Sequence, residues 1–178
     1  DLTDQEVRAS TYIWRLVQYL RERAPGFENC HLIQTYPIGI RETRRILGDY
    51  YLTLDDVLEA RRHDDDVLLC GYFADIHAYD GWRFYFPPEG TQVKGGGAYG
   101  IPYGCLLPRN VEGLLIAGRH LSASHEAQGS PRVMGTCMGM GHAAGTAAAL
   151  AAHGGIAPRQ LDIRLLQETL SEQGAILR

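Results

Sequence analysis

The residues best suited to chemistry lie in one stretch, residues 114–151, where an apolar segment, a glycine, a polar segment and a run of small residues follow one another. This order predicts a strand, a loop and a helix, and Arg119 and Arg132 both lie in the loop. A strand that leads to a helix N-terminus forms a site for an anion or a dipole, because unpaired backbone N–H groups point outward there. The alternative is a buried strand–helix unit whose small residues only permit tight packing, and the spacing leaves both interpretations open.

A second candidate is the group of arginines at residues 41–45. Arg41 and Arg45 differ by an even number of positions, so on a strand they share one face, whereas Arg44 takes the other. Two guanidinium groups on one face suit recognition of a carboxylate. The alternative is a solvated face on which Glu42 and Asp49 neutralise the arginines.

Metal binding and nucleophilic catalysis have weaker signals. Two histidine–carboxylate groups lack the H-E-x-x-H spacing of a helical zinc site: Asp75, His77 and Asp80, and His120, His125 and Glu126. Three serines near these histidines lack a G-x-S-x-G turn: Ser122, Ser124 and Ser130. The triplet Gly95-Gly96-Gly97 precedes neither G-K-[ST] nor a helix, which indicates a flexible loop. We therefore predict no metal site.

Mixed helices and strands must position these residues. Thr3 and Glu6 form a capping box that opens the first helix, and Thr53 caps a short one. Glycines in the helix after the polar loop cost roughly 1 kcal/mol each in helix propensity, which indicates close approach to a strand or a ligand. Predicted helices span 4–23, 54–62, 136–152 and 163–173, predicted strands lie within 42–52, at 99–107 and at 111–118, and the apolar stretch 64–76 is ambiguous.

Composition excludes several classes. The chain of 178 residues is 45% hydrophobic and 21% charged, as in globular proteins, and its net charge of −4 lacks the basic footprint of a nucleic-acid binder. No apolar run approaches the roughly 20 residues that span a bilayer. The four cysteines form no C-x-x-C pair, although a two-disulfide secreted domain stays formally open. We expect a cytoplasmic protein.

The motifs in order resemble one family. These are residues 114–127 (LLIAGRHLSASHEA), 132–138 (RVMGTCM) and 141–145 (GHAAG), preceded by 39–46 (GIRETRRI), 75–77 (DIH) and 101–103 (IPY). Together they resemble the C-terminal, FAD-contacting segment of the FAD-dependent oxidoreductases, a family related to the fumarate-reductase-like flavoproteins. The order and spacing match over about residues 5–155.

The resemblance implies FAD as the cofactor and assigns the residues that hold it. Ala117, Gly118 and Arg119 would lie along its ribitol and pyrophosphate, with Gly118 permitting close backbone approach. The helix N-terminus would present its backbone N–H groups to the N1/C2=O edge of the flavin, where the reduced ring is negatively charged. This second set is Gly135, Thr136, Cys137 and Met138.

The resemblance also implies the catalytic and substrate-facing residues. Arg132 would face the flavin or an anionic substrate, and His77 would serve as an acid or base. Arg41 and Arg45 would bind a small organic substrate, with two electrons passing as hydride between that substrate and the flavin.

The implied fold is α+β, arranged as the C-terminal fragment of a two-domain flavoprotein. Residues 1–110 would form the substrate-facing α+β region, 111–157 the last strand and helix of the FAD-binding domain, and 158–178 a terminal helix. The chain begins with Asp1 and has no G-x-G-x-x-G fold at its start, so we expect a missing N-terminal dinucleotide-binding half. Exposed surfaces would then favour a homo-oligomer. The alternatives are a non-catalytic binding or structural module without cofactor and, less favoured, a metallohydrolase.

Overall fold

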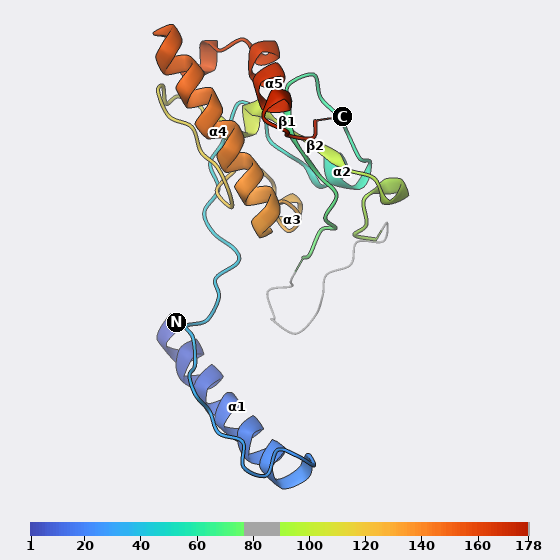
Figure 1. The fold of residues 1–178 in the computed structure, drawn as a ribbon, viewed down its shortest axis with the longest axis vertical. Coiled ribbons are helices and arrows are strands. Elements are labelled where there is room, and N and C mark those ends of the chain that lie inside the picture. The colour runs from blue at the N-terminus through green and yellow to red at the C-terminus, as the bar shows by residue number, and fades with distance from the viewer. Residues whose placement is uncertain (77–89, 178) are drawn as a thin grey trace. The chain divides into compact units, whose positions relative to one another are not determined.

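The computed structural model describes residues 1–76 and 90–177, which form two compact units (Figure 1). The first unit is Asp1–Arg41 and the second is Glu42–Arg178. Each unit is described by itself below.

The first unit consists of one long helix and the extended chain that returns along it. Helix α1 (Leu2–Arg23) begins earlier than predicted, because Asp1 caps it: the Asp4 N–H donates to Asp1 Oδ1 at 3.0 Å. The expected Thr3–Glu6 capping box is therefore wrong; Glu6 instead accepts a bond from the Ile38 N–H at 3.0 Å. No residue of α1 is buried in the described structure, although the helix carries large apolar side chains.

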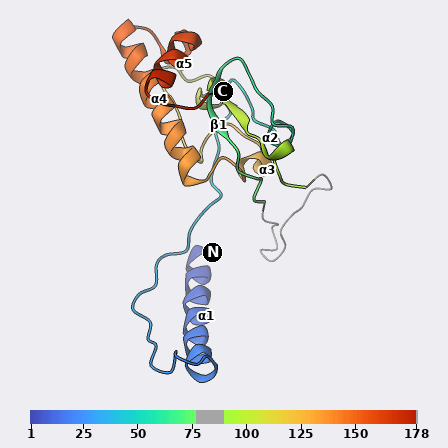
Figure 2. The ribbon, with the colours of Figure 1, turned by 45° about the vertical axis from the view of Figure 1, so that its right-hand side comes forward.

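The second unit is built on a small antiparallel sheet covered by two helices. Strands β1 (Asp66–Cys70) and β2 (Tyr99–Pro102) pair with Leu69 opposite Gly100. Figures 1 and 2 show helices α4 (Met134–Gly154) and α5 (Ile163–Glu172) side by side against this sheet. The ambiguous stretch at 64–76 thus contains a strand, and the α+β class is confirmed.

Small residues let α4 approach the sheet closely, as predicted. A Cβ added to Gly139 would lie 2.6 Å from a methyl carbon of Leu68 in β1, so any larger residue would force the Leu68 side chain to shift. The buried face of α4 runs along Met140, Ala143 and Ala147, one turn apart. The gain in packing outweighs the low helix propensity of the glycines.

Short elements complete the unit. The predicted helix at 54–62 is shorter, and the predicted strand at 99–107 gives way to a 3₁₀ turn after Pro102. The remaining elements are α2 (Leu54–Leu58), η1 (Lys94–Gly96), η2 (Tyr103–Leu106), α3 (His125–Gln128) and η3 (Pro158–Gln160).

Two predicted strand regions are wrong as far as the described chain goes. Residues 42–52 form only isolated bridges, Gly48 to Pro108 and Leu52 to Ala123. Residues 111–118 belong to no sheet of the described residues, although the Ile116 N–H donates to the Leu106 carbonyl at 2.9 Å. Residues 111–118 are apolar and residues 42–52 carry strand-forming residues around a Gly48-Asp49 turn, but a strand forms only where a second strand pairs with its backbone.

The cysteines are all free thiols: Cys30, Cys70, Cys105 and Cys137. The two-disulfide alternative is therefore wrong. Among the described residues, no helix is both long and apolar enough to cross a membrane.

Candidate functional site

The two segments expected to hold the cofactor lie next to each other. Gly118 ends the apolar segment with a φ of +86°, a conformation that strongly favours glycine. A Cβ added there would lie 3.9 Å from the Cys137 sulfur, in the first turn of α4. The charge of Arg119 also acts on Cys137, so this arginine belongs to the same site. The polar loop thus returns the chain to the start of α4.

The first turn of α4 is open to solvent. Val133 is the N-cap, and no side-chain hydrogen bond within the described part of the chain caps the helix. Met134 and Met138 are 83% and 75% exposed, and a Cβ added to Gly135 would meet no atom of the described residues within 4 Å. This open helix N-terminus is where N–H groups and the helix dipole attract negative charge.

Thr136 and Cys137 contribute to this turn in different ways from their neighbours. The hydroxyl of Thr136 points inward and lies 3.4 Å from the Cys70 sulfur of β1, so only its backbone is available to a ligand. Burial raises the pKa of the Cys137 thiol, although the charge of Arg119 lowers it. Cys137 is therefore a neutral thiol whose proton points to the Pro131 carbonyl, 3.7 Å away.

Arg132 lies just before α4 and is fixed in a cluster of acidic groups. Its side chain is only 5% exposed, and one guanidinium nitrogen donates to the Asp75 carbonyl at 2.7 Å. The carboxylates of Asp75 and Glu42 lie 3.6 and 3.7 Å from the guanidinium. The same Glu42 is 3.8 Å from His125 Nδ1. Arg132 is thus a buried cation held by two carboxylates from distant parts of the sequence.

Gly129 makes this cluster possible. A Cβ at Gly129 would lie 2.7 Å from the Asp75 carbonyl oxygen and 3.1 Å from that of Glu126. Glycine lets the turn after α3 pass close to the Asp75 backbone. Arg132, three residues later, can then reach the Asp75 carbonyl.

Arg45 holds the polar loop instead of pointing to open solvent. Its Nε donates to the Ala123 carbonyl at 2.9 Å, and the neighbouring Ile46 N–H donates to the His120 carbonyl at 3.0 Å. Arg41 belongs to the first unit. The expected pairing of Arg41 and Arg45 on one strand face is wrong, because residues 42–52 form no strand. Their roles in binding a substrate stay predictions.

Gln128 and Glu42 support the site and were not predicted from the sequence. The Gln128 amide is fully buried and donates to the Arg119 carbonyl at 2.9 Å, which fixes the turn after Gly118. A lone glutamine among small residues (Ala127-Gln128-Gly129) is the only sequence signal for this role. Nothing near Glu42 in the sequence points to Arg132, which lies 90 positions away.

Nucleophilic catalysis by serine and metal binding find little support in the described residues. Ser124 caps α3, and Ser130 donates to the Tyr72 carbonyl at 2.5 Å, so both hydroxyls have structural partners. Over residues 1–76 and 90–177, no group of three or more histidines, cysteines or carboxylates could hold a metal ion. His77 and Asp80 lie outside the described residues, so the role of His77 stays a prediction.

A positive-φ glycine beside an open helix N-terminus, with an arginine close by, is an arrangement typical of proteins that bind an anionic group. Residues 1–170 match the family model described as FAD dependent oxidoreductase, and the chain belongs to this family. No curated protein and no solved structure matches the chain.

Proposed function

We propose that this chain forms the flavin-facing and substrate-facing part of an FAD-dependent oxidoreductase that moves two electrons, as hydride, between a small organic substrate and the flavin. The observation that carries the proposal is the closeness of Gly118 to the open first turn of α4, where an added Cβ would lie 3.9 Å from the Cys137 sulfur, together with the charge of Arg119, which acts on the same residue. These residues fit an anionic, planar cofactor, because the glycine and the exposed backbone leave room for close approach.

Two sets of residues would hold FAD, which supplies the two-electron chemistry when bound. Ala117, Gly118 and Arg119 would lie along its ribitol and pyrophosphate. The residues Gly135, Thr136, Cys137 and Met138 at the start of α4 would face the flavin. The backbone N–H groups of the first helical residues, among them Gly135 and Thr136, would stabilise negative charge on it, whereas the Cys137 N–H already donates to the Val133 carbonyl at 2.9 Å.

Arg132 would contribute a fixed positive charge near the start of α4. Because Asp75 and Glu42 already hold it, the guanidinium needs no reorganisation when a substrate or the cofactor binds. His77 would supply or accept a proton, and Arg41 and Arg45 would bind the substrate or support the loop that does.

We also propose that the chain works with a dinucleotide-binding half supplied by a longer protein. Residues 111–118 carry a strand-like apolar sequence whose backbone joins no sheet of the described residues, and Leu114 is exposed. A strand from that half would satisfy this backbone. Without it, the same surfaces favour self-association into a homo-oligomer.

The proposal is tested by FAD binding, followed by visible absorbance and by quenching of flavin fluorescence. Gly118→Ala places a methyl group between the loop and Cys137, in a φ region that alanine disfavours, and should weaken binding by tenfold or more. Gly113→Ala is the matched control: it has a similar φ of +72°, and no described atom lies within 4 Å of the added Cβ.

The titration is run on the 178-residue chain and on a longer protein that carries a dinucleotide-binding half before it. Binding in either form that is lost in Gly118→Ala and kept in Gly113→Ala supports the assignment. Equal affinity of the two variants in the form that binds would refute it. If neither form binds FAD, the chain is a non-catalytic module.

A further inference from the structure

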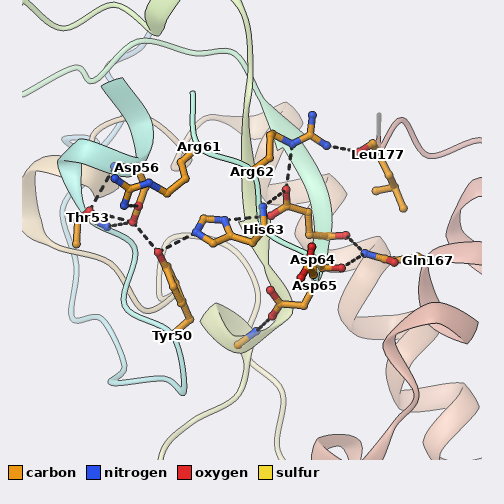
Figure 3. Close-up of polar contacts among 12 residues, drawn as sticks. Tyr50, Thr53, Asp56, Arg61, Arg62, His63, Asp64, Asp65, Gln167 and Leu177 are labelled. Atoms are coloured by element: carbon orange, nitrogen blue, oxygen red, sulfur yellow. Dashed lines mark hydrogen bonds and ion pairs between the residues drawn. The ribbon is translucent and has the colours of Figure 1, made fainter. Parts of the chain in front are cut away.

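A connected set of polar side chains, most of them buried or partly buried, lies outside the flavin-facing site and centres on His63, in the loop before β1. Figure 3 shows the imidazole pointing to Tyr50 on one side, and on its other side Nδ1 lies 3.4 Å from the Asp66 carboxylate. The rings of Tyr50 and His63 meet edge to face, with centroids 4.7 Å apart, so the imidazole is fixed in orientation. Each of its two nitrogens therefore faces one defined partner.

The proton on the first nitrogen follows from the hydrogen bonds of Asp56. This fully buried carboxylate accepts from the Thr53 N–H at 2.8 Å, the Thr53 hydroxyl at 2.9 Å and Arg61 at 2.5 Å. Burial raises the pKa of Asp56, but these hydrogen bonds and the Arg61 charge lower it by more, so the pKa is below its ordinary value. Asp56 is therefore ionised and can only accept hydrogen bonds. Tyr50 lies 3.1 Å from Asp56 and must donate its single proton there.

Tyr50 therefore accepts from the imidazole. Burial and the Asp56 charge raise the pKa of Tyr50 to about 12, so its hydroxyl is protonated at neutral pH. With that proton donated to Asp56, the 2.8 Å contact to His63 Nε2 requires a proton on Nε2. The neutral form of His63 that fits this side has a bare Nδ1.

The other side of the ring favours a proton on Nδ1 as well. Nδ1 lies 3.4 Å from Asp66 Oδ1, and neither atom has a hydrogen-bond partner among the described residues. The Asp66 side chain is 3% exposed. A bare Nδ1 would set two buried acceptors against each other, whereas a protonated Nδ1 would face the carboxylate with opposite charge.

Asp66 connects this ring to the C-terminal segment 175–177. Its Oδ2 accepts from Arg62 Nε at 3.0 Å, and Arg62 in turn donates to the Leu177 carbonyl. The Gln167 amide of α5 also donates to the Asp66 carbonyl at 2.9 Å. A groove of about 1130 Å³ lies between the His63–Asp66 loop and the end of α5, which leaves space for the segment to move.

We propose that His63 is a proton-controlled latch. Its imidazolium keeps Asp66 turned towards Arg62 and so holds segment 175–177 on the protein. Loss of the Nδ1 proton as the pH rises places two acceptors face to face, turns Asp66 away and releases the segment.

The surroundings leave His63 as the group that responds near neutral pH. The titratable or charged groups on its own loop and on the elements around it are Arg61, Arg62, Asp64, Asp65, Tyr50, Asp56 of α2, Asp66 of β1, Tyr103 and Cys105 of η2, and Arg164, Glu168 and Glu172 of α5. Of these side-chain types only histidine has a reference pKa well inside the range of about pH 5.5 to 8.5, and burial raises the pKa of the Cys105 thiol above its ordinary value.

The test follows the amide of Ala175, which donates to the Leu170 carbonyl at 2.9 Å in the closed state. Its hydrogen exchange is measured by NMR on the 178-residue chain from about pH 5.5 to 8.5 and corrected for the intrinsic pH dependence. Imidazole ¹⁵N shifts of His63 report its protonation in the same samples. We expect protection of Ala175 to fall by roughly tenfold as Nδ1 loses its proton.

Two substitutions of His63 distinguish the roles of its two ring nitrogens. His63→Asn places a neutral donor near the Nδ1 position and should protect Ala175 at every pH. His63→Gln places its amide near the Nε2 position and should leave Ala175 unprotected at every pH. His142→Gln is the matched control, because His142 contacts Gln173 at the end of α5 at 2.6 Å and should not change the pH response.

Wild-type results alone decide the proposal if a variant fails to fold. Corrected exchange of Ala175 that is independent of pH would overturn it. So would an Nδ1 that stays neutral across the range, or a pH response that disappears in His142→Gln.

Discussion

Gly100→Ala should be among the most damaging single-methyl additions in this protein. The added Cβ would lie 1.7 Å from Asp66 Oδ2 and 1.9 Å from its Cγ, far inside any allowed contact. Gly100 has little freedom to move, because its N–H donates to the Arg61 carbonyl at 2.8 Å and it pairs with Leu69 across the sheet. The Asp66 carboxylate must therefore leave its place.

The cost follows from what Asp66 then loses. Its Oδ2 accepts from Arg62 Nε and from the His63 N–H, each at 3.0 Å. Hydrogen bonds to a charged group contribute about 1.5–3 kcal/mol each, with the lower end fitting the partly exposed Arg62, so the loss is about 3–4.5 kcal/mol. Domains unfold with about 5–15 kcal/mol in total, so the change is large.

Urea unfolding followed by circular dichroism measures this loss as a shift in midpoint at constant slope. Gly141→Ala is the control: no described atom lies within 4 Å of the added Cβ in helix α4, and alanine should stabilise the protein by up to about 1 kcal/mol. If Gly100→Ala unfolds within about 0.5 kcal/mol of the wild type, the Asp66 carboxylate does not lie against β2 and the account of this cluster fails.

Two further predictions concern buried charge. Arg132→Met should lower the free energy of unfolding by about 1.5–3 kcal/mol, because the Asp75 carbonyl and two carboxylates lose their cation. Urea unfolding measures this loss, with Arg109→Met at an exposed position as the control. Equal unfolding midpoints of the two variants would contradict the buried cluster. Asp56 has a lowered pKa, so its contribution is present above the unfolded pKa of about 3.9 and is lost as the pH falls through the folded pKa. The stability difference between wild type and Asp56→Asn should therefore shrink on acidification from about pH 6 to 2, and a constant difference would show that the carboxylate is not held ionised.

The long periodic elements could be predicted from the sequence because their signal is local. Helices α4 and α5 begin and end within two residues of their predicted bounds, since amphipathic spacing and small-residue packing act along one element. Strand β1 was ambiguous, because a short apolar run fits a buried strand and a buried helix equally well. The contact that decides it, the pairing with β2, joins residues about 30 positions apart.

The wrong strand predictions have a different physical cause. The apolar sequence at 111–118 and the strand-turn-strand pattern at 42–52 are local signals, but a sheet needs a second backbone in register. Arg45, for example, donates to the Ala123 carbonyl and holds its segment without a ladder. No local pattern shows whether such a partner strand exists.

The candidate site divides in the same way. The loop and helix start around Gly118 and Cys137 were predicted as one site, because they lie at the two ends of a single polar segment of the sequence. The partners of Arg132 were not, since Glu42 and Asp75 lie 90 and 57 positions earlier in the sequence. Charge pairs over such distances depend on the whole fold.

The glycines at 95–97 and at 100 show that a glycine-rich motif does not indicate where the fold excludes a side chain. The triplet at 95–97 is the most motif-like string in the chain, yet Cβ atoms added to Gly95 or Gly96 would meet no described atom within 4 Å. Gly100 excludes a side chain because a buried carboxylate occupies that space. The need for glycine at Gly95 and Gly96 lies in the backbone angle, whereas at Gly100 it lies in a neighbour that only the fold supplies. A glycine that matters to the buried charges is therefore found by what lies against it, and its substitution tests that neighbour as much as the glycine itself.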